Sequence, residues 1–247
     1  MPPVVRPALV AATLSACVLV LGGCGGERSA APLAEIASHE QAAPAENGVD
    51  QKSPDQALAT VLTALESKGS YHVTGTTASG GAIDISFKVG AGASGTVDSG
   101  SPVTLVALEG RVYVTGDAEF MATNVGPDAA ARMAGKWLLL PQDSTSSFAI
   151  FADGMTFADR VLGAQGPVEM TDVRDVNGLP ALGLVFAETG GTLWVSAEGD
   201  PLPIQFDEKG ASGGTGVLTF TDFGAEVAIQ APAAESVVDA ESLPAPG

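Results

Sequence analysis

The stretch "SPDQALATVLTALESKGSYHVTGTTASGGAIDISFKVG", residues 53–90, decides the fold class, because one helix signal is followed at once by two strand signals. Ser53 suits an N-cap, Pro54 the first helical position, Gln56 the return of a capping box and Gly69 the C-terminal stop. Apolar residues recur between them at the spacing of a single helix face: Leu58, Val61, Leu62 and Leu65. We therefore expect an amphipathic helix whose apolar side packs on a sheet.

The second half of this stretch predicts a hairpin around the turn Ser79-Gly80-Gly81. In its second strand the side chains alternate, with Ile83, Ile85, Phe87 and Val89 on one face and Asp84, Ser86 and Lys88 on the other. We therefore expect one face of the sheet to be covered and the other face to be exposed to solvent.

Further strand signals follow at short intervals along the chain. We expect strands over residues 93–98, 103–108, 111–115, 168–176, 181–187, 192–197, 202–207, 215–222 and 226–230. Between residues 127 and 164 helical spacing interrupts them, with Thr156 as an expected N-cap before "FADRVLG". The whole predicts an α+β protein with an antiparallel sheet and two or three short inserted helices.

The N-terminus carries an export signal. Arg6 is the sole charge before Glu27, and the apolar run over residues 7–21 is shorter than the roughly 20 residues of a membrane span. "LGGC", residues 21–24, resembles a bacterial lipobox, which implies cleavage before a lipid-modified Cys24. "LSAC", residues 14–17, is a rival match, but cleavage there would leave too short an apolar run.

The cysteine count supports an anchor at Cys24. Once the leader with Cys17 is removed, a single thiol remains, so no disulfide can form within the mature chain. Two or three acyl chains hold a protein stably to a membrane. We therefore expect a protein on the extracytoplasmic face of the cell membrane, with residues 1–23 as signal peptide. Residues 24–52 would form a flexible tether, 53–232 the folded domain and 233–247 a flexible acidic tail.

Charge excludes one large class of function. The chain has 11 basic and 29 acidic residues, and loss of Arg6 with the leader gives the mature chain a net charge of −19. Such a surface repels phosphate backbones, so nucleic acid is excluded as a partner.

The motifs of catalysis are weak. "GASGG", residues 210–214, has the letters of a nucleophile elbow, but it joins two strands instead of a strand and a helix. His72 is the one histidine outside the tether, and "DVRDVNG", residues 172–178, lacks the order of a calcium loop. We therefore expect a binding protein, with no enzymatic activity, cofactor or metal.

The order of several short segments resembles the LppX/LprG-type lipoproteins of actinobacteria, a family similar in fold to the periplasmic carrier LolA. These segments are "YHVTGTT", "GRVYVTG", "GKWLLLP" at 135–141, the helical insert, "GDPLPIQF" at 199–206 and "VAIQAP", spanning residues 53–232. The resemblance implies a strongly curved half-barrel of about 10–11 antiparallel strands, with helices on its concave face. It also implies that this face holds the acyl chains of lipids or acylated glycolipids for transfer across the envelope.

The expected lining of that hollow consists of inward-facing strand residues and apolar residues of the helical insert. They are Ile83, Ile85, Phe87, Leu182, Leu184, Phe186, Leu193, Val195, Ile204, Phe206, Leu218 and Phe220 on strands, and Phe148, Phe151, Phe157 and Leu162 at the mouth. The same residues would form an ordinary core if the hollow were filled. The chain would then be an envelope interaction module of the same fold, a partner for a membrane transporter or sensor.

Overall fold

The computed structural model describes residues 45–141, 147–163 and 166–243, all within the compact unit Ala43–Gly247. Cys17 and Cys24 lie outside these residues. The helices are α1 (Pro54–Lys68), α2 (Ala118–Val125), α3 (Pro127–Ala130) and α4 (Gly154–Leu162), with 3-10 turns η1 (Val49–Gln51), η2 (Ser147–Phe151), η3 (Ala234–Ser236) and η4 (Ala240–Ser242). The strands are β1 (Ser70–Thr76), β2 (Ala82–Lys88), β3 (Gly92–Asp98), β4 (Pro102–Leu108), β5 (Arg111–Gly116), β6 (Trp137–Leu139), β7 (Val168–Met170), β8 (Arg174–Val176), β9 (Leu179–Phe186), β10 (Thr192–Ser196), β11 (Pro203–Lys209), β12 (Thr215–Thr221) and β13 (Val237–Asp239).

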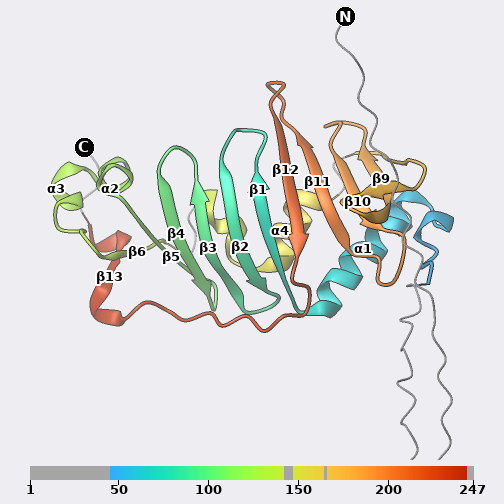
Figure 1. Cartoon of the computed structure of the whole chain (residues 1–247). Coiled ribbons are helices and arrows are strands. Elements are labelled where there is room, and N and C mark those ends of the chain that lie inside the picture. The colour runs from blue at the N-terminus through green and yellow to red at the C-terminus, as the bar shows by residue number, and fades with distance from the viewer. Residues whose placement is uncertain (1–44, 142–146, 164–165, 244–247) are drawn as a thin grey trace, which may run out of the picture. The chain divides into compact units, whose positions relative to one another are not determined.

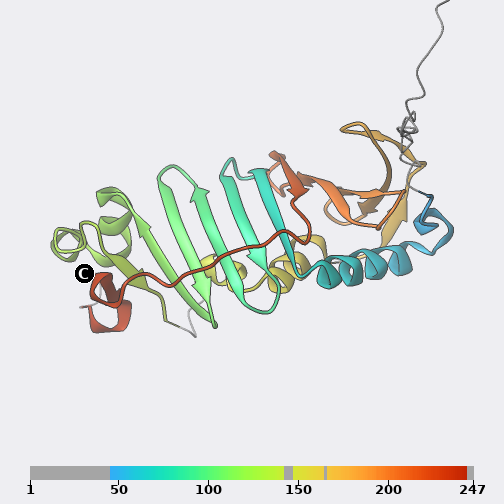
Figure 2. The same ribbon diagram turned by 60° about the horizontal axis from the view of Figure 1, so that its bottom comes forward.

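The strands form one open sheet, in the order β13-β6-β5-β4-β3-β2-β1-β12-β11-β10-β9-β7, with β8 also paired to β9. Figures 1 and 2 show α1 and α4 against the same side of this sheet, called the covered face below. The α+β class and the antiparallel sheet with helices on one face are confirmed. Among the described residues the sheet has 13 strands, more than the expected 10–11.

The opening stretch folds as its sequence predicts. The Ser53 hydroxyl accepts from the Gln56 N–H at 3.3 Å, and the Gln56 side chain accepts from the Ser53 N–H at 3.2 Å, which completes a capping box. Gly69 ends the helix in the left-handed conformation. Leu58, Val61 and Leu65 are buried against the sheet.

Two expectations about strands are wrong, and two strands were missed. The run 168–176 divides into β7 and β8, and residues 226–230 form no strand. After β12 the chain turns at Asp222 and Gly224, both with positive φ, and thereby leaves the sheet. The short strands β6 and β13 were not expected.

The folded part also extends beyond the expected limits of 53 and 232. Asn47 donates its side-chain N–H to the Ser196 carbonyl at 2.8 Å, and Val49 is buried. At the other end, residues 237–239 pair with β6 within the stretch that was expected to be a free tail. Among the described residues, no helix combines the length and apolarity needed to span a membrane.

Candidate functional site

The helical insert η2–α4 fills the middle of the covered face. The Phe157 ring of α4 lies 4.8 Å from the Phe87 ring of β2, and Phe151 lies 5.9 Å from Phe157, measured between ring centroids. Tyr71 of β1 stacks on the other side of Phe87 at 4.9 Å. These aromatic side chains occupy the space over β1 and β2 in which an open hollow was expected.

The N-terminus of α4 is fixed to the sheet by polar contacts. Asp153, and not the expected Thr156, is the N-cap: its carboxylate accepts from the N–H groups of Met155 at 3.0 Å and Thr156 at 3.3 Å. The same carboxylate accepts from the Gly90 N–H, in the turn between β2 and β3, at 2.7 Å. α4 therefore begins at a residue that also bonds to the sheet.

A buried tyrosine adds a second anchor. The Tyr71 hydroxyl donates to the carbonyl oxygen of Gly154, the first residue of α4. Burial raises the pKa of Tyr71 above its usual value, and the negative charges of Asp153 and Asp159 raise that pKa further. The phenol is therefore held neutral, in the form that can donate this hydrogen bond.

The structure brings most of the expected lining residues together, but as a packed cluster. Fourteen of the sixteen are buried in one core, namely Ile83, Ile85, Phe87, Phe151, Phe157, Leu162, Leu182, Leu184, Phe186, Leu193, Val195, Phe206, Leu218 and Phe220. Phe148 is partly buried and packs against this core. The residues expected to line an open hollow are thus mostly buried in one core.

Ile204 lies elsewhere, and its predicted place is wrong. A β-bulge between Trp194 and Val195 shifts the register of β10 against β11, so Ile204 joins a small cluster with Trp194 apart from the main core. There the Arg174 guanidinium lies 3.7 Å from the centroid of the Trp194 ring, and the indole N–H donates to Asp207 at 2.8 Å. This cluster is separate from the main core on the covered face.

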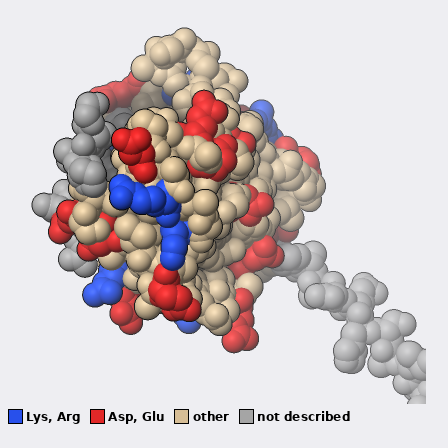
Figure 3. Space-filling model, turned by 90° about the vertical axis from the view of Figure 1, so that its left-hand side faces the viewer, with Lys and Arg blue, Asp and Glu red and all other residues tan. Residues whose placement is uncertain are grey.

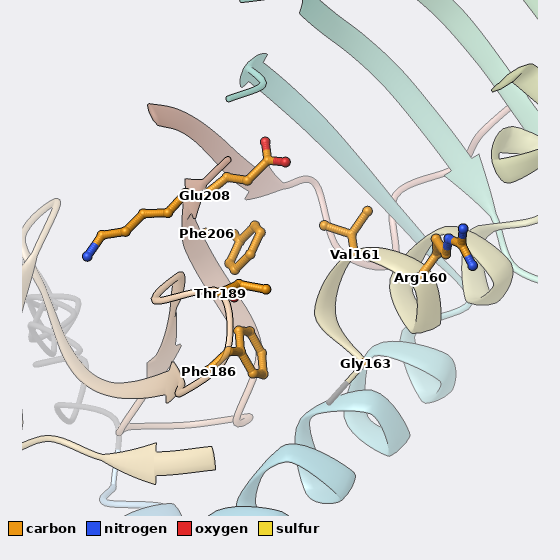
Figure 4. A pocket seen from close by; sticks show the side chains of 8 residues that line it. Arg160, Val161, Gly163, Phe186, Thr189, Phe206 and Glu208 are labelled. Carbon is orange, nitrogen blue, oxygen red and sulfur yellow. The ribbon is translucent and has the colours of Figure 1, made fainter. Parts of the chain in front are cut away.

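The first open space is a cleft of about 160 Å³ between the end of α4 and the strands β9 and β11, called the Phe206 cleft. Figure 4 shows the Phe186 and Phe206 rings directed from the sheet toward Val161 of α4, while Arg160 points away from them. The two rings meet edge to face at 5.9 Å. Two of the expected lining residues therefore border an opening.

The second space is larger, about 460 Å³, and is called the Phe148 groove. It lies between the β3–β4 hairpin, α2 and η2, and its lining residues are Val97, Ser99, Gly100, Ser101, Val103, Glu119, Phe120, Thr123, Asn124 and Phe148. Phe120 and Phe148 meet edge to face at 6.1 Å and form its aromatic wall. Sequence reasoning identified Phe148 alone among these residues. Val97 and Val103 lie in two strands that were predicted, and the apolar side chains of those strands were the signal that could have identified them.

The described part of the chain was searched for clusters of side chains that could hold a metal ion. Among residues 45–141, 147–163 and 166–243, no three His, Cys, Asp or Glu side chains are placed to hold a metal ion. His72, the one described histidine, forms a hydrogen bond with Asp84 through Nε2 at 2.8 Å. The two spaces beside the insert are therefore the candidate functional sites.

No protein-family model and no curated protein matches the sequence. Among solved structures, the chain is similar to LprF from Mycobacterium bovis, at 15% identity and a TM-score of 0.48, over 73% of this chain and 97% of that one. An uncharacterized conserved protein from Thermus thermophilus is similar at 12% identity and a TM-score of 0.42, over 76% and 99%. MucB in complex with MucA(peri) is similar at 15% identity and a TM-score of 0.35, over 74% of this chain and 60% of that one.

Identities of 15% or less leave the function to be inferred from this chain's own residues.

Proposed function

We propose that this protein is an extracytoplasmic lipoprotein, held to the cell membrane through Cys24, that binds an acyl chain of a lipid or acylated glycolipid in the Phe148 groove. The observation on which this proposal rests is the groove itself, which has a volume of about 460 Å³ and lies beside the buried core. Sites for small ligands have volumes of about 300–1,000 Å³. The smaller Phe206 cleft, at the other end of the insert, would take a second apolar segment.

The wall and rim of the groove favour an uncharged, hydroxyl-rich head on this ligand. Val97, Val103, Phe120 and Phe148 offer apolar surface, and burial of an acyl chain gains about 25 cal/mol per Å² of area removed from water. The rim adds Ser99, Ser101, Thr123 and Asn124, with Glu119 as the sole charged residue of the lining in the described part of the chain. Hydroxyl and amide groups bond to sugar hydroxyls, whereas the Glu119 carboxylate repels a phosphate.

Native mass spectrometry of a Cys24→Ala variant tests the proposal, since lipid that copurifies would be seen directly. Thr123→Trp places a large ring from α2 into the groove, and Thr96→Trp places the same ring on an exposed position of β3 outside it. We expect Thr123→Trp to lose at least tenfold in affinity for a fluorescent glycolipid with a single acyl chain, and Thr96→Trp to keep it. Equal affinities in both variants would exclude the groove as the site.

The filled centre of the covered face supports a second candidate, an envelope interaction module of the same fold. Diacyl or triacyl cargo needs more room than the present spaces, unless the insert moves. Absence of any copurified lipid, together with no binding of the fluorescent lipid by the wild-type chain, would favour this alternative. Transfer of lipid between membranes would then be excluded as well.

A further inference from the structure

One edge of the sheet is occupied by the chain's own C-terminal segment. β13 pairs with β6 over three residue pairs: Val237 with Trp137, Val238 with Leu138 and Asp239 with Leu139. This pairing is parallel, while all other strand pairs of the described residues are antiparallel. An antiparallel neighbour can arrive through a short hairpin, but β13 arrives as a separate strand from far along the chain.

The route to this edge is long and weakly packed. The Gly224 N–H donates to the Ser70 carbonyl at 3.0 Å, after which residues 225–233 run without regular structure past the ends of the strands (Figures 1 and 2). None of residues 222–233 is buried. β13 is thus tethered to the domain by a segment that packing does little to hold.

The contacts of β13 itself are also modest. Val237 and Val238 are half-buried, and Val238 packs against the core together with Ala240 and Leu243. The Lys136 ammonium donates to the carbonyl oxygen of Glu235 at 2.8 Å, just before the strand. Each residue placed in a strand loses conformational entropy, and three pairs with half-buried side chains offset little of that loss. β13 is therefore a strand that can be exchanged.

We propose that the edge of β6 is a docking edge for an extended segment of a partner protein, and that β13 occupies this edge until the partner replaces it. Addition of a strand to a sheet edge is a common mode of peptide recognition, in which backbone bonds give affinity and side chains give selectivity. The sequence of β13 defines the partner's chemistry: two adjacent β-branched aliphatic residues followed by a carboxylate.

Two basic residues stand just before the edge strand β6. Arg132 and Lys136 precede β6 in a chain with 11 basic and 29 acidic residues. Figure 3 views this end of the molecule and shows basic side chains gathered between acidic ones. Lys136 already binds the backbone of the resident segment, and the same ammonium can serve an incoming one.

A peptide with the sequence of residues 233–243, labelled with a fluorophore, is the probe for this edge. Val237→Asp with Val238→Asp, in the full chain, weakens β13 and exposes β6. Because a tethered segment competes at an effective concentration in the millimolar range, we expect the opened variant to bind the peptide at least tenfold more tightly than the wild type. Gln230→Asp, an exposed change in the connecting segment, should bind like the wild type. Failure of the opened variant to bind the peptide would overturn the proposal.

A reversible lock provides a second test that does not depend on the folding of the opened variant. Leu139 and Asp239 are register partners on β6 and β13, and neighbouring strands lie within the range that a disulfide spans. Leu139→Cys with Asp239→Cys, with both native cysteines replaced by Ala, should lose peptide binding when oxidised and regain it on reduction. Binding that is equal in the two states would overturn the proposal. The wild-type protein could also form a dimer in solution that is lost in the oxidised disulfide variant. That result would assign the β6 edge to a second copy of this chain and would overturn the proposal of a partner protein.

Discussion

Tyr71 is a residue whose burial makes stability depend on alkaline pH. Its pKa is raised in the folded state, whereas in the unfolded chain it lies near 10. The contribution of Tyr71 to the free energy of unfolding is therefore complete below about pH 10. As pH rises further the unfolded chain releases the phenol proton first, and this contribution is lost at about 1.4 kcal/mol per pH unit. We expect the free energy of unfolding in urea to fall more steeply above pH 10 in the wild type than in Tyr71→Phe.

At pH 7 the Tyr71→Phe variant should itself be about 1 kcal/mol less stable, since the Gly154 carbonyl loses its partner. If the free energy of unfolding fell equally steeply above pH 10 in both proteins, the loss of stability could not be assigned to the Tyr71 phenol.

The carboxylate of Asp153 makes two kinds of structural contact, one with its own helix and one with the sheet. It caps α4 and accepts from Gly90 in the sheet, so Asp153→Ala removes both. We expect a loss of about 1–2 kcal/mol in the free energy of unfolding, the upper range for an N-cap, by urea titration followed with circular dichroism. Asp159→Ala changes an exposed carboxylate of the same helix and is the matched control. A loss no greater than that of the control would show that the cap contributes nothing.

At the scale of elements, β1 depends on a glycine where it passes β12. Gly75 has a φ of 144°, and a Cβ placed there would lie only 1.9 Å from the Val217 carbonyl oxygen. The Gly75→Ala change must therefore part the two strands or strain the backbone, at a cost of about 1–3 kcal/mol. Thr76→Ala, at the exposed end of the same strand, should cost much less. Hydrogen exchange that increases in β1 and β12 alone would verify the location of the damage, and unchanged exchange there would contradict it.

Elements whose signals are local could be predicted from sequence, and elements made by distant contacts could not. Residues 53–90 contain their own caps, turn and alternation, so α1, β1 and β2 were predicted nearly to their ends. β6 and β13 have three residues each, too few for a periodic pattern, and each becomes a strand by pairing with distant parts of the chain. The bulge that moves Ile204 is likewise a property of two paired strands.

At the scale of the whole molecule, alternation predicts which side chains face inward but not how much space remains between them. Fourteen of the sixteen expected lining residues are buried in one core, yet the larger opening is lined mostly by other residues, on α2 and the β3–β4 hairpin. The volume of a groove depends on where helices come to lie on a sheet. That placement is determined by contacts such as those of Asp153 and Tyr71 with the helical insert, and no single segment encodes it.

The charge of the whole molecule makes the proposed membrane attachment depend on a single residue, which can be tested. A mature chain with a net charge of −19 is repelled by anionic lipid headgroups, so the folded part adds no electrostatic attraction to the membrane. The proposed attachment therefore rests on acyl chains on Cys24, which contribute about 0.8 kcal/mol per buried methylene. Cys24→Ala should release the protein from the membrane fraction, as immunoblots of fractionated cells would show. Cys17→Ala, within the predicted leader, should leave the protein membrane-bound, and the opposite pattern would move the cleavage site to "LSAC".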